Sequence, residues 1–198
     1  MADELELKAV VPEPAALRAR LADAGAAPGF RGRMTDRRYD RDGTLLRGDQ
    51  VLRVRSYSPA DGPARFELAW KGPTGRSVEG YKRRAELTSE VRPAPDEPHL
   101  ILEALGFRVV HTIDRWVEVW SLAGAVARLE WYPRMDVLLE VEGTPPQIEA
   151  AVLATGLPRD AFSADALIDF VRRYELRGGT AALAVADLRG DSPGWEAA

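Results

Sequence analysis

Charged and apolar residues alternate in short segments along the chain. In the first segment, Glu4, Glu6 and Lys8 stand at every second position, and apolar residues lie between them. Successive side chains of an extended strand point to opposite faces of the sheet. The pattern therefore predicts a strand with one charged face and one apolar face.

The same alternation returns in five later segments. Each carries a pair of charged residues two or four positions apart, and the pairs are Arg53 and Arg55, Glu67 and Lys71, Arg84 and Glu86, Arg128 and Glu130, and Glu140 and Glu142. If these faces belong to one sheet and point the same way, they form a surface dense in both signs of charge. Arg and Lys bind phosphate directly, and clustered carboxylates hold a cation against the same phosphate. The repeated pattern thus favours recognition of a polyanion.

Four segments between these strands have the period and the flanking residues of helices. They span residues 14–24, 96–105, 146–155 and 163–174. Ser163 is the expected N-cap of the last helix. Hairpins with interspersed helices predict an antiparallel α+β domain, in which the apolar strand faces pack outward on the helices and the charged faces turn inward.

The composition is that of one globular domain. The chain has 198 residues, of which 45% are apolar and 29% are charged, and it has no cysteine, which excludes disulfides and thiolate metal sites. No apolar run approaches the roughly 20 residues of a membrane span, and charges begin at Asp3, so no signal peptide is expected. A net charge of −4 argues against nucleic-acid binding. We therefore expect a cytoplasmic protein with no nucleic-acid or membrane partner, either a monomer or a homodimer.

The order of the charged motifs resembles that of the CYTH family, also called triphosphate tunnel metalloenzymes. This family includes class IV adenylyl cyclases, thiamine triphosphatases and inorganic tripolyphosphatases. The matching motifs are Glu4-x-Glu6-x-Lys8, Tyr39-Asp40, Leu52-Arg53-x-Arg55, Lys71-Gly72-Pro73, Arg84-x-Glu86, Glu130 and Glu140-x-Glu142. The resemblance extends from Glu4 to about Arg177. It implies an eight-stranded antiparallel β tunnel with helices packed outside over residues 1–177, and we expect residues 178–198 to be a poorly ordered tail.

The resemblance also implies roles for the charged residues. Glu4, Glu6 and Lys8 would be catalytic, and Glu86 would support an arginine. Mg²⁺ or Mn²⁺ would be bound by Glu4, Glu6, Glu130, Glu140 and Glu142, because hard cations prefer carboxylate oxygen. The phosphates would be held by Lys8, Arg53, Arg55, Lys71, Arg84, Arg115 and Arg128.

Three positions depart from the family pattern. Val117 stands where many members have a second base after Arg115, Glu130 replaces the usual Asp, and Thr88 stands where a second Glu often follows the Arg-x-Glu motif. These departures concern substrate choice and turnover more than the fold.

The sequence favours metal-dependent hydrolysis of a triphosphate, which is inorganic tripolyphosphate, a nucleoside triphosphate or thiamine triphosphate. A class IV adenylyl cyclase is the first alternative, but it must also hold a purine and a ribose in attack geometry, and no such pocket is evident. The second alternative is a non-catalytic binder of polyphosphate or nucleotide, which fits the missing base at Val117. The choice of triphosphate and the number of metal ions stay open.

Overall fold

The computed structural model describes residues 2–91 and 97–197. The strands are β1 Ala2–Val10, β2 Ala27–Asp40, β3 Val51–Pro59, β4 Arg65–Lys71, β5 Gly75–Arg76, β6 Lys82–Val91, β7 Arg108–Leu122, β8 Ala125–Trp131 and β9 Leu138–Glu142. The α-helices are α1 Pro14–Asp23, α2 Thr44–Arg47, α3 Glu97–Ala104, α4 Pro145–Thr155 and α5 Leu167–Leu176. Short 3₁₀ helices span Arg159–Ala161, Val185–Asp187 and Gly194–Ala197.

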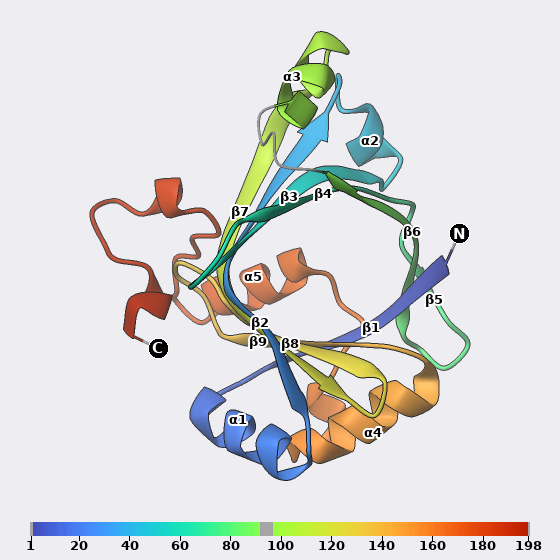
Figure 1. Cartoon of the computed structure of the whole chain (residues 1–198), viewed down its shortest axis with the longest axis vertical. Coiled ribbons are helices and arrows are strands. Elements are labelled where there is room, and N and C mark those ends of the chain that lie inside the picture. Colours follow the sequence, from blue (N-terminus) through green and yellow to red (C-terminus); the bar gives the residue numbers. More distant parts are fainter. Residues whose placement is uncertain (1, 92–96, 198) are drawn as a thin grey trace.

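Eight of these strands form a closed antiparallel barrel (Figure 1). The order around the barrel is β1-β9-β8-β7-β2-β3-β4-β6, and pairing of β6 with β1 closes the ring. The two-residue strand β5 pairs with β6 outside this ring. The predicted α+β class and the eight-stranded antiparallel barrel are confirmed.

The outer face of the barrel is apolar on the side that the helices cover. Leu7 on β1 and Leu129 on β8 are almost inaccessible to solvent, and they belong to one core cluster with Leu21 of α1 and Ile148 of α4. Helices α1 and α4 also contact each other beneath the barrel (Figure 1). Because removal of apolar area from water drives packing, this arrangement fixes which strand faces point outward. The charged faces consequently turn into the barrel, as the alternation predicts.

The predicted helices are present with small shifts in their ends. Helix α4 begins after a capping box, in which the side chain of Gln147 accepts a hydrogen bond from the backbone N–H of Thr144 at 2.8 Å. The predicted start of the second helix at residue 96 lies outside the described residues. Over the two described ranges of the chain, no helix has the length and the apolar character needed to cross a membrane.

The expected N-cap at Ser163 is wrong. Helix α5 begins at Leu167, four residues later than predicted, and its N-cap is Ala166. Ser163 instead exchanges two backbone hydrogen bonds with Lys8, each 2.8 Å long. It thus pairs with β1 beyond Glu6, where the pairing of β1 with β6 ends. The backbone of Ser163 is thus committed to a β-bridge, which excludes the helical conformation that the sequence signal favours.

A single-turn helix between β2 and β3 was not expected from the sequence. The carboxylate of Asp40 accepts hydrogen bonds from the backbone N–H groups of Arg41, Leu45 and Leu46. Burial acts to raise the pKa of Asp40, but these three bonds outweigh it and lower the pKa. Asp40, which belongs to one of the matching motifs, therefore holds the turn at the edge of the cavity.

The segment after residue 177, predicted to be a poorly ordered tail, lies against the barrel. The backbone N–H of Asp114 donates to the carbonyl of Leu183 at 2.7 Å. Ala182 and Ala184 are buried at alternate positions, and the 3₁₀ helices Val185–Asp187 and Gly194–Ala197 follow them. Burial with a period of two is that of an extended chain rather than of a helix.

Candidate functional site

The barrel encloses a cavity of about 940 Å³. Its lining includes every residue to which the resemblance assigns a role in catalysis, metal binding or phosphate binding: Glu4, Glu6, Lys8, Arg53, Arg55, Lys71, Arg84, Glu86, Arg115, Arg128, Glu130, Glu140 and Glu142. These residues come from seven strands that are spread along 139 positions of the sequence (4 to 142). Closure of the barrel brings them together because each occupies an inward position of its strand.

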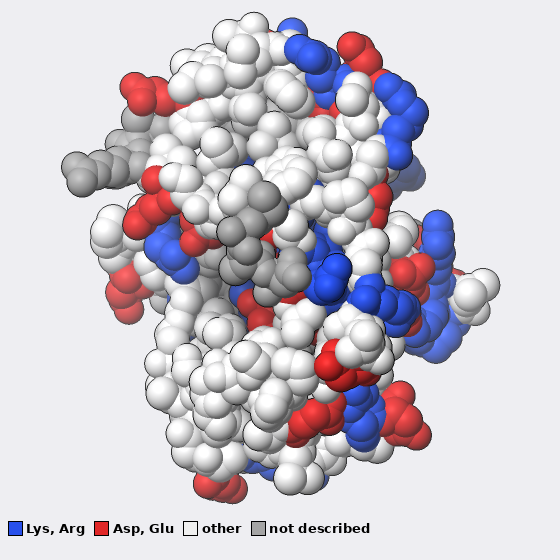
Figure 2. Space-filling model, turned by 90° about the vertical axis from the view of Figure 1, so that its right-hand side faces the viewer, with Lys and Arg blue, Asp and Glu red and all other residues white. Residues whose placement is uncertain are grey.

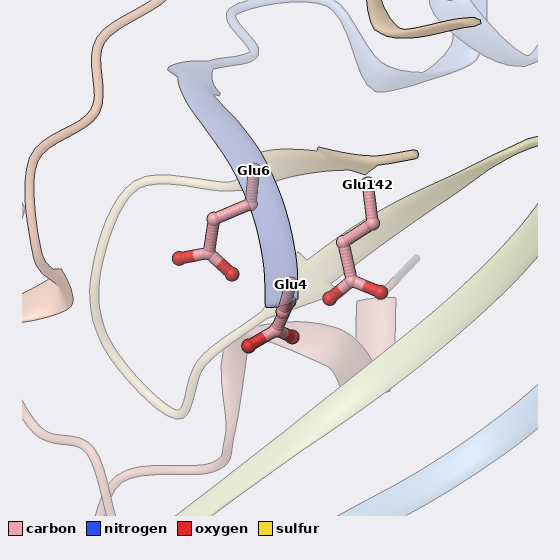
Figure 3. Close-up of side chains that lie close together, drawn as sticks. All are labelled: Glu4, Glu6 and Glu142. Atoms are coloured by element: carbon pink, nitrogen blue, oxygen red, sulfur yellow. The ribbon is translucent and has the colours of Figure 1, made fainter. Parts of the chain in front are cut away.

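Three carboxylates gather where β1 and β9 lie side by side. Oxygen atoms of Glu4, Glu6 and Glu142 all lie within 4.8 Å of one another, and we refer to these residues as the carboxylate triad (Figure 3). Glu6 pairs with Glu142 in the register of the two strands, which explains the closeness. Oxygen donors in such a group are the ligands that Mg²⁺ and Mn²⁺ prefer.

One member of the carboxylate triad, Glu142, lies in surroundings that disfavour its ionised form. Burial raises the pKa of Glu142 to about 8, and although Arg128 acts to lower it, the neighbouring Glu140 and Glu4 raise it further. Arg128 donates a hydrogen bond to Glu142 at 3.0 Å, but this cation does not outweigh burial and the two neighbouring carboxylates. The donor set therefore fits a divalent cation.

The other two predicted metal ligands lie in the cavity but outside the carboxylate triad. Glu130 accepts hydrogen bonds from Arg115 at 2.8 Å and from the hydroxyl of Tyr132 at 2.6 Å. Glu140 forms ion pairs with Lys8 and Arg128. Glu130 and Glu140 thus contact cationic or hydroxyl donors and lie outside the carboxylate triad.

Lys8 lies between two carboxylates. Its ammonium group is 2.6 Å from Glu6 and also contacts Glu140, and only 5% of Lys8 is exposed. Burial acts to lower the pKa of Lys8, but Glu140 and Glu6 more than offset this and raise it, so the group is charged at neutral pH. Lys82 reaches the same Glu6 at 2.5 Å from β6.

Lys71 and Glu86 connect the triad with the arginines of β3. The ammonium group of Lys71 is 2.5 Å from Glu4 and 3.0 Å from Glu86, and Arg53 donates to Glu86 at 3.2 Å. Glu86 thus contacts both Lys71 and Arg53. Arg84 turns toward the rim of the cavity, where it donates to the backbone carbonyls of Gly72 at 2.6 Å and Asp49 at 2.7 Å.

Asp36 is the centre of the opposite wall, and sequence reasoning did not identify it. Its carboxylate accepts hydrogen bonds from Arg55 at 2.5 and 2.9 Å and from Arg115 at 3.2 Å, while Arg53 lies 3.6 Å away. Burial acts to raise the pKa of Asp36, but the three guanidinium groups hold it well below its usual range. A signal was available, because Asp36 and Arg38 stand two positions apart in β2, as the recognised pairs do in their strands. Arg38, Lys82 and Tyr132 are among the further cavity-lining residues to which the sequence assigned no role.

Val117 occupies an inward position of β7, two residues after Arg115, but it does not line the cavity. It is completely buried in an apolar cluster with Met34 and Tyr57. The hydroxyl of Tyr57 remains at the cavity surface, where it donates to Glu67 at 3.1 Å. The cavity therefore ends at this apolar cluster on the Val117 side.

Charged groups are also visible from outside the molecule. Figure 2 shows the face that carries β5, β6 and the N-terminal strand, with basic and acidic side chains interspersed along one edge and between its upper and lower parts. Lys82 and Arg84 of β6 belong both to this side of the barrel and to the cavity lining.

No family model matches the sequence, and no curated protein matches it. Solved structures do resemble the fold. A protein from Vibrio parahaemolyticus called a "putative adenylate cyclase" is 16% identical, with a TM-score of 0.72 over 85% of this chain and 97% of that chain. A protein from Pyrococcus horikoshii is 20% identical, with a TM-score of 0.67 over 86% of this chain and 98% of that chain.

A third similar structure carries a statement about activity in its name. It is the "putative adenylyl cyclase" HpAC1 from Hippeastrum, which "reveals a dominant" triphosphatase activity. It is 19% identical, and the match has a TM-score of 0.62 over 92% of this chain and 99% of that chain. At these identities the likeness establishes the fold, which is a CYTH-like barrel, as the resemblance of the motifs implies.

Proposed function

We propose that this protein is a metal-dependent triphosphatase that cleaves a phosphoanhydride bond of a triphosphate inside the barrel. The observation that carries this proposal is the joint presence, in one cavity, of the carboxylate triad and of inward-facing Lys and Arg side chains. Carboxylates alone would suit a cation, and arginines alone would suit any anion. A ligand that uses both is a polyphosphate with its divalent cation.

The carboxylate triad would hold Mg²⁺ or Mn²⁺, which supplies charge neutralisation and a more acidic bound water. Lys8 and Arg128 would bind phosphate oxygens next to the triad, because both groups are already fixed there by Glu140. Arg53, Arg55 and Arg115 would bind oxygens from the opposite wall. Burial of these groups removes water from around the phosphates and so strengthens each electrostatic contact in the transition state.

Adenylyl cyclase activity is the second candidate, because the Vibrio parahaemolyticus and Hippeastrum proteins carry that name. The two reactions use the same cation and the same basic residues, and they differ in the nucleophile. A hydrolase directs water at the terminal phosphate, whereas a cyclase directs the ribose hydroxyl at the phosphate next to the sugar. The triphosphatase activity named for the Hippeastrum protein supports hydrolysis as the first choice.

The test is to incubate the purified protein with tripolyphosphate, ATP and thiamine triphosphate, each with Mg²⁺ or Mn²⁺, and to resolve the products. Release of orthophosphate supports the proposal, and the substrate with the highest kcat/KM identifies the triphosphate. Cyclic AMP as the main product of ATP would favour the cyclase. Binding without any turnover would instead identify a non-catalytic polyphosphate or nucleotide binder. Glu4→Gln serves as the control for a contaminating phosphatase, since its loss of a triad carboxylate should abolish any genuine activity.

A further inference from the structure

One guanidinium group in the cavity has no carboxylate partner. Arg38 lies on β2, lines the cavity and forms no ion pair or hydrogen bond within the described part of the chain, and its Nε atom is buried without a hydrogen-bond acceptor. A buried donor that is left unsatisfied costs roughly 1 to 3 kcal/mol. Native proteins keep such groups where a ligand completes them.

The neighbour of Arg38 across the strand pair is also a guanidinium group. Arg38 and Arg53 are directly opposite each other in the register of β2 and β3, and the Nε of Arg53 is likewise buried without an acceptor. Like charges at directly opposed positions destabilise a sheet. Burial, together with repulsion from Arg53 and Arg115, outweighs the attraction of Asp36 and lowers the pKa of Arg38 to about 10, so the group stays cationic at neutral pH.

The one acid at the centre of this wall does not neutralise these charges. Asp36 is engaged by Arg55 and Arg115 at hydrogen-bond distance, and Arg53 lies 3.6 Å from it. Arg38, Arg53 and Arg55 together are called the guanidinium wall below. Strand β2 is four strands from β1 in either direction around the ring, so the guanidinium wall faces the carboxylate triad across the cavity.

We infer that Arg38 and Arg53 form a phosphoryl-binding subsite on the wall opposite the carboxylate triad, and that Arg38 is a substrate-binding residue which the sequence motifs do not include. The identity of the ligand rests on the proposed function. The two unsatisfied Nε donors bind the oxygens of one phosphoryl group, while the rest of the chain extends toward β1. Arg38 thereby adds a cation to the same cavity in which Val117 provides none.

The test uses binding without metal or turnover. Tripolyphosphate is titrated into the intact protein in EDTA, for wild type, Arg38→Ala, Arg38→Lys and Arg37→Ala, and melting temperatures are recorded with and without ligand. Arg37 is the matched control, because it adjoins Arg38, carries the same charge and instead lies exposed against His99 at 3.0 Å. A charge-assisted hydrogen bond corresponds to roughly a tenfold or greater change in affinity.

We expect Arg38→Ala to weaken tripolyphosphate binding at least tenfold. The affinity of Arg38→Lys should lie between those of wild type and Arg38→Ala. Arg37→Ala should change affinity by less than about twofold. Without ligand, Arg38→Ala should melt no lower than wild type, because it removes an uncompensated charge. Equal affinity of wild type and Arg38→Ala, or no binding by wild type, would overturn the inference. A lower melting temperature with unchanged affinity would show that Arg38 has only a structural role. Failure of the proposed function appears separately, as binding in EDTA without hydrolysis when metal is added.

Discussion

The two opposite walls of the cavity differ in how their buried charged side chains are paired. At the carboxylate triad, Glu4 and Glu6 each have a lysine at 2.5 Å and Glu142 has Arg128 at 3.0 Å, yet burial and the neighbouring carboxylates still raise the pKa of Glu142. At the guanidinium wall, several arginines surround Asp36, and the surplus is positive at Arg38. The difference teaches that neither wall is complete alone. A further cation at the triad would favour ionised Glu142, and a further anion at the guanidinium wall would pair with Arg38; a metal–polyphosphate ligand provides both.

Asp36→Ala should have the largest effect, because it removes the buried acid that pairs with Arg55 and Arg115 and lies 3.6 Å from Arg53. Breaking a buried charge pair from one side costs about 3 to 5 kcal/mol in the free energy of unfolding. Chemical denaturation measures this loss. Asp191→Ala is the matched control, since Asp191 pairs with Arg134 at an exposed position and should change stability by less than about 1 kcal/mol.

If Asp36→Ala proves as stable as wild type, the wall does not depend on its central acid. Addition of tripolyphosphate should restore part of the lost stability, because the ligand replaces the missing negative charge. A variant that tripolyphosphate leaves unchanged would contradict the assignment of the wall to phosphate.

Glu4→Gln should affect turnover rather than folding. The substitution keeps the size of the side chain and the apolar outer face of β1, but it removes one charge from the carboxylate triad. We expect turnover of the best triphosphate substrate to fall roughly 100-fold or more, since a cation in such a site contributes several kcal/mol to the transition state. Steady-state kinetics at saturating substrate and low metal provide the measurement, and undiminished activity there would exclude the triad as the metal site.

Arg53→Ala should distinguish phosphate chains by length. A triphosphate reaches both walls, whereas a monophosphate binds at one of them, so the loss should be larger for the triphosphate. One charge-assisted hydrogen bond contributes roughly 1.5 to 3 kcal/mol, which is about one to two decades of affinity. Arg55→Ala should behave similarly. Calorimetric titration with the two ligands tests this, and equal losses would show that these residues do not sense chain length.

The smallest effect concerns pH at the carboxylate triad. Because the pKa of Glu142 is raised to about 8, this carboxyl is protonated in the folded protein at pH 7 but ionised in the unfolded chain. Between about pH 4.5 and 8 the folded state therefore binds more protons than the unfolded state. The contribution of Glu142 to the free energy of unfolding declines as pH rises through that window. Binding of Mn²⁺ releases the proton, and affinity should increase by up to about tenfold per pH unit below pH 8. A pH-independent affinity for Mn²⁺ would contradict this.

The period-two alternation of charge predicted the antiparallel α+β class and the inward charged faces, whereas the closed eight-stranded barrel was predicted only from the resemblance to the CYTH family. The alternation worked for β1, β3 and β9 because a charged inner face and an apolar outer face leave one register possible. It missed Asp36 and Arg38, since three consecutive charged residues from Asp36 to Arg38 hide the alternation in β2. The helix-capping signal was misleading at Ser163, because the backbone of this residue pairs with Lys8 instead of beginning a helix.

Val117 shows what a motif comparison leaves out. The sequence marks it as a missing base, but only the structure shows that Met34 and Tyr57 pack against it and end the cavity there. An arginine at this position would be buried without an anionic partner, so Val117→Arg should lower the melting temperature without tightening the binding of a triphosphate. The packing of three side chains from three strands is not encoded in any one segment.

The central claim is that the two walls bind different halves of one ligand. The most direct measurement is a calorimetric titration of Mn²⁺ into the protein without phosphate, for wild type, Glu142→Gln and Arg53→Ala. The account predicts saturable binding of Mn²⁺ by wild type, loss of that binding in Glu142→Gln, and retention in Arg53→Ala, since Arg53 lies on the other wall. Equal binding of Mn²⁺ by wild type and Glu142→Gln, or none by wild type, would contradict it.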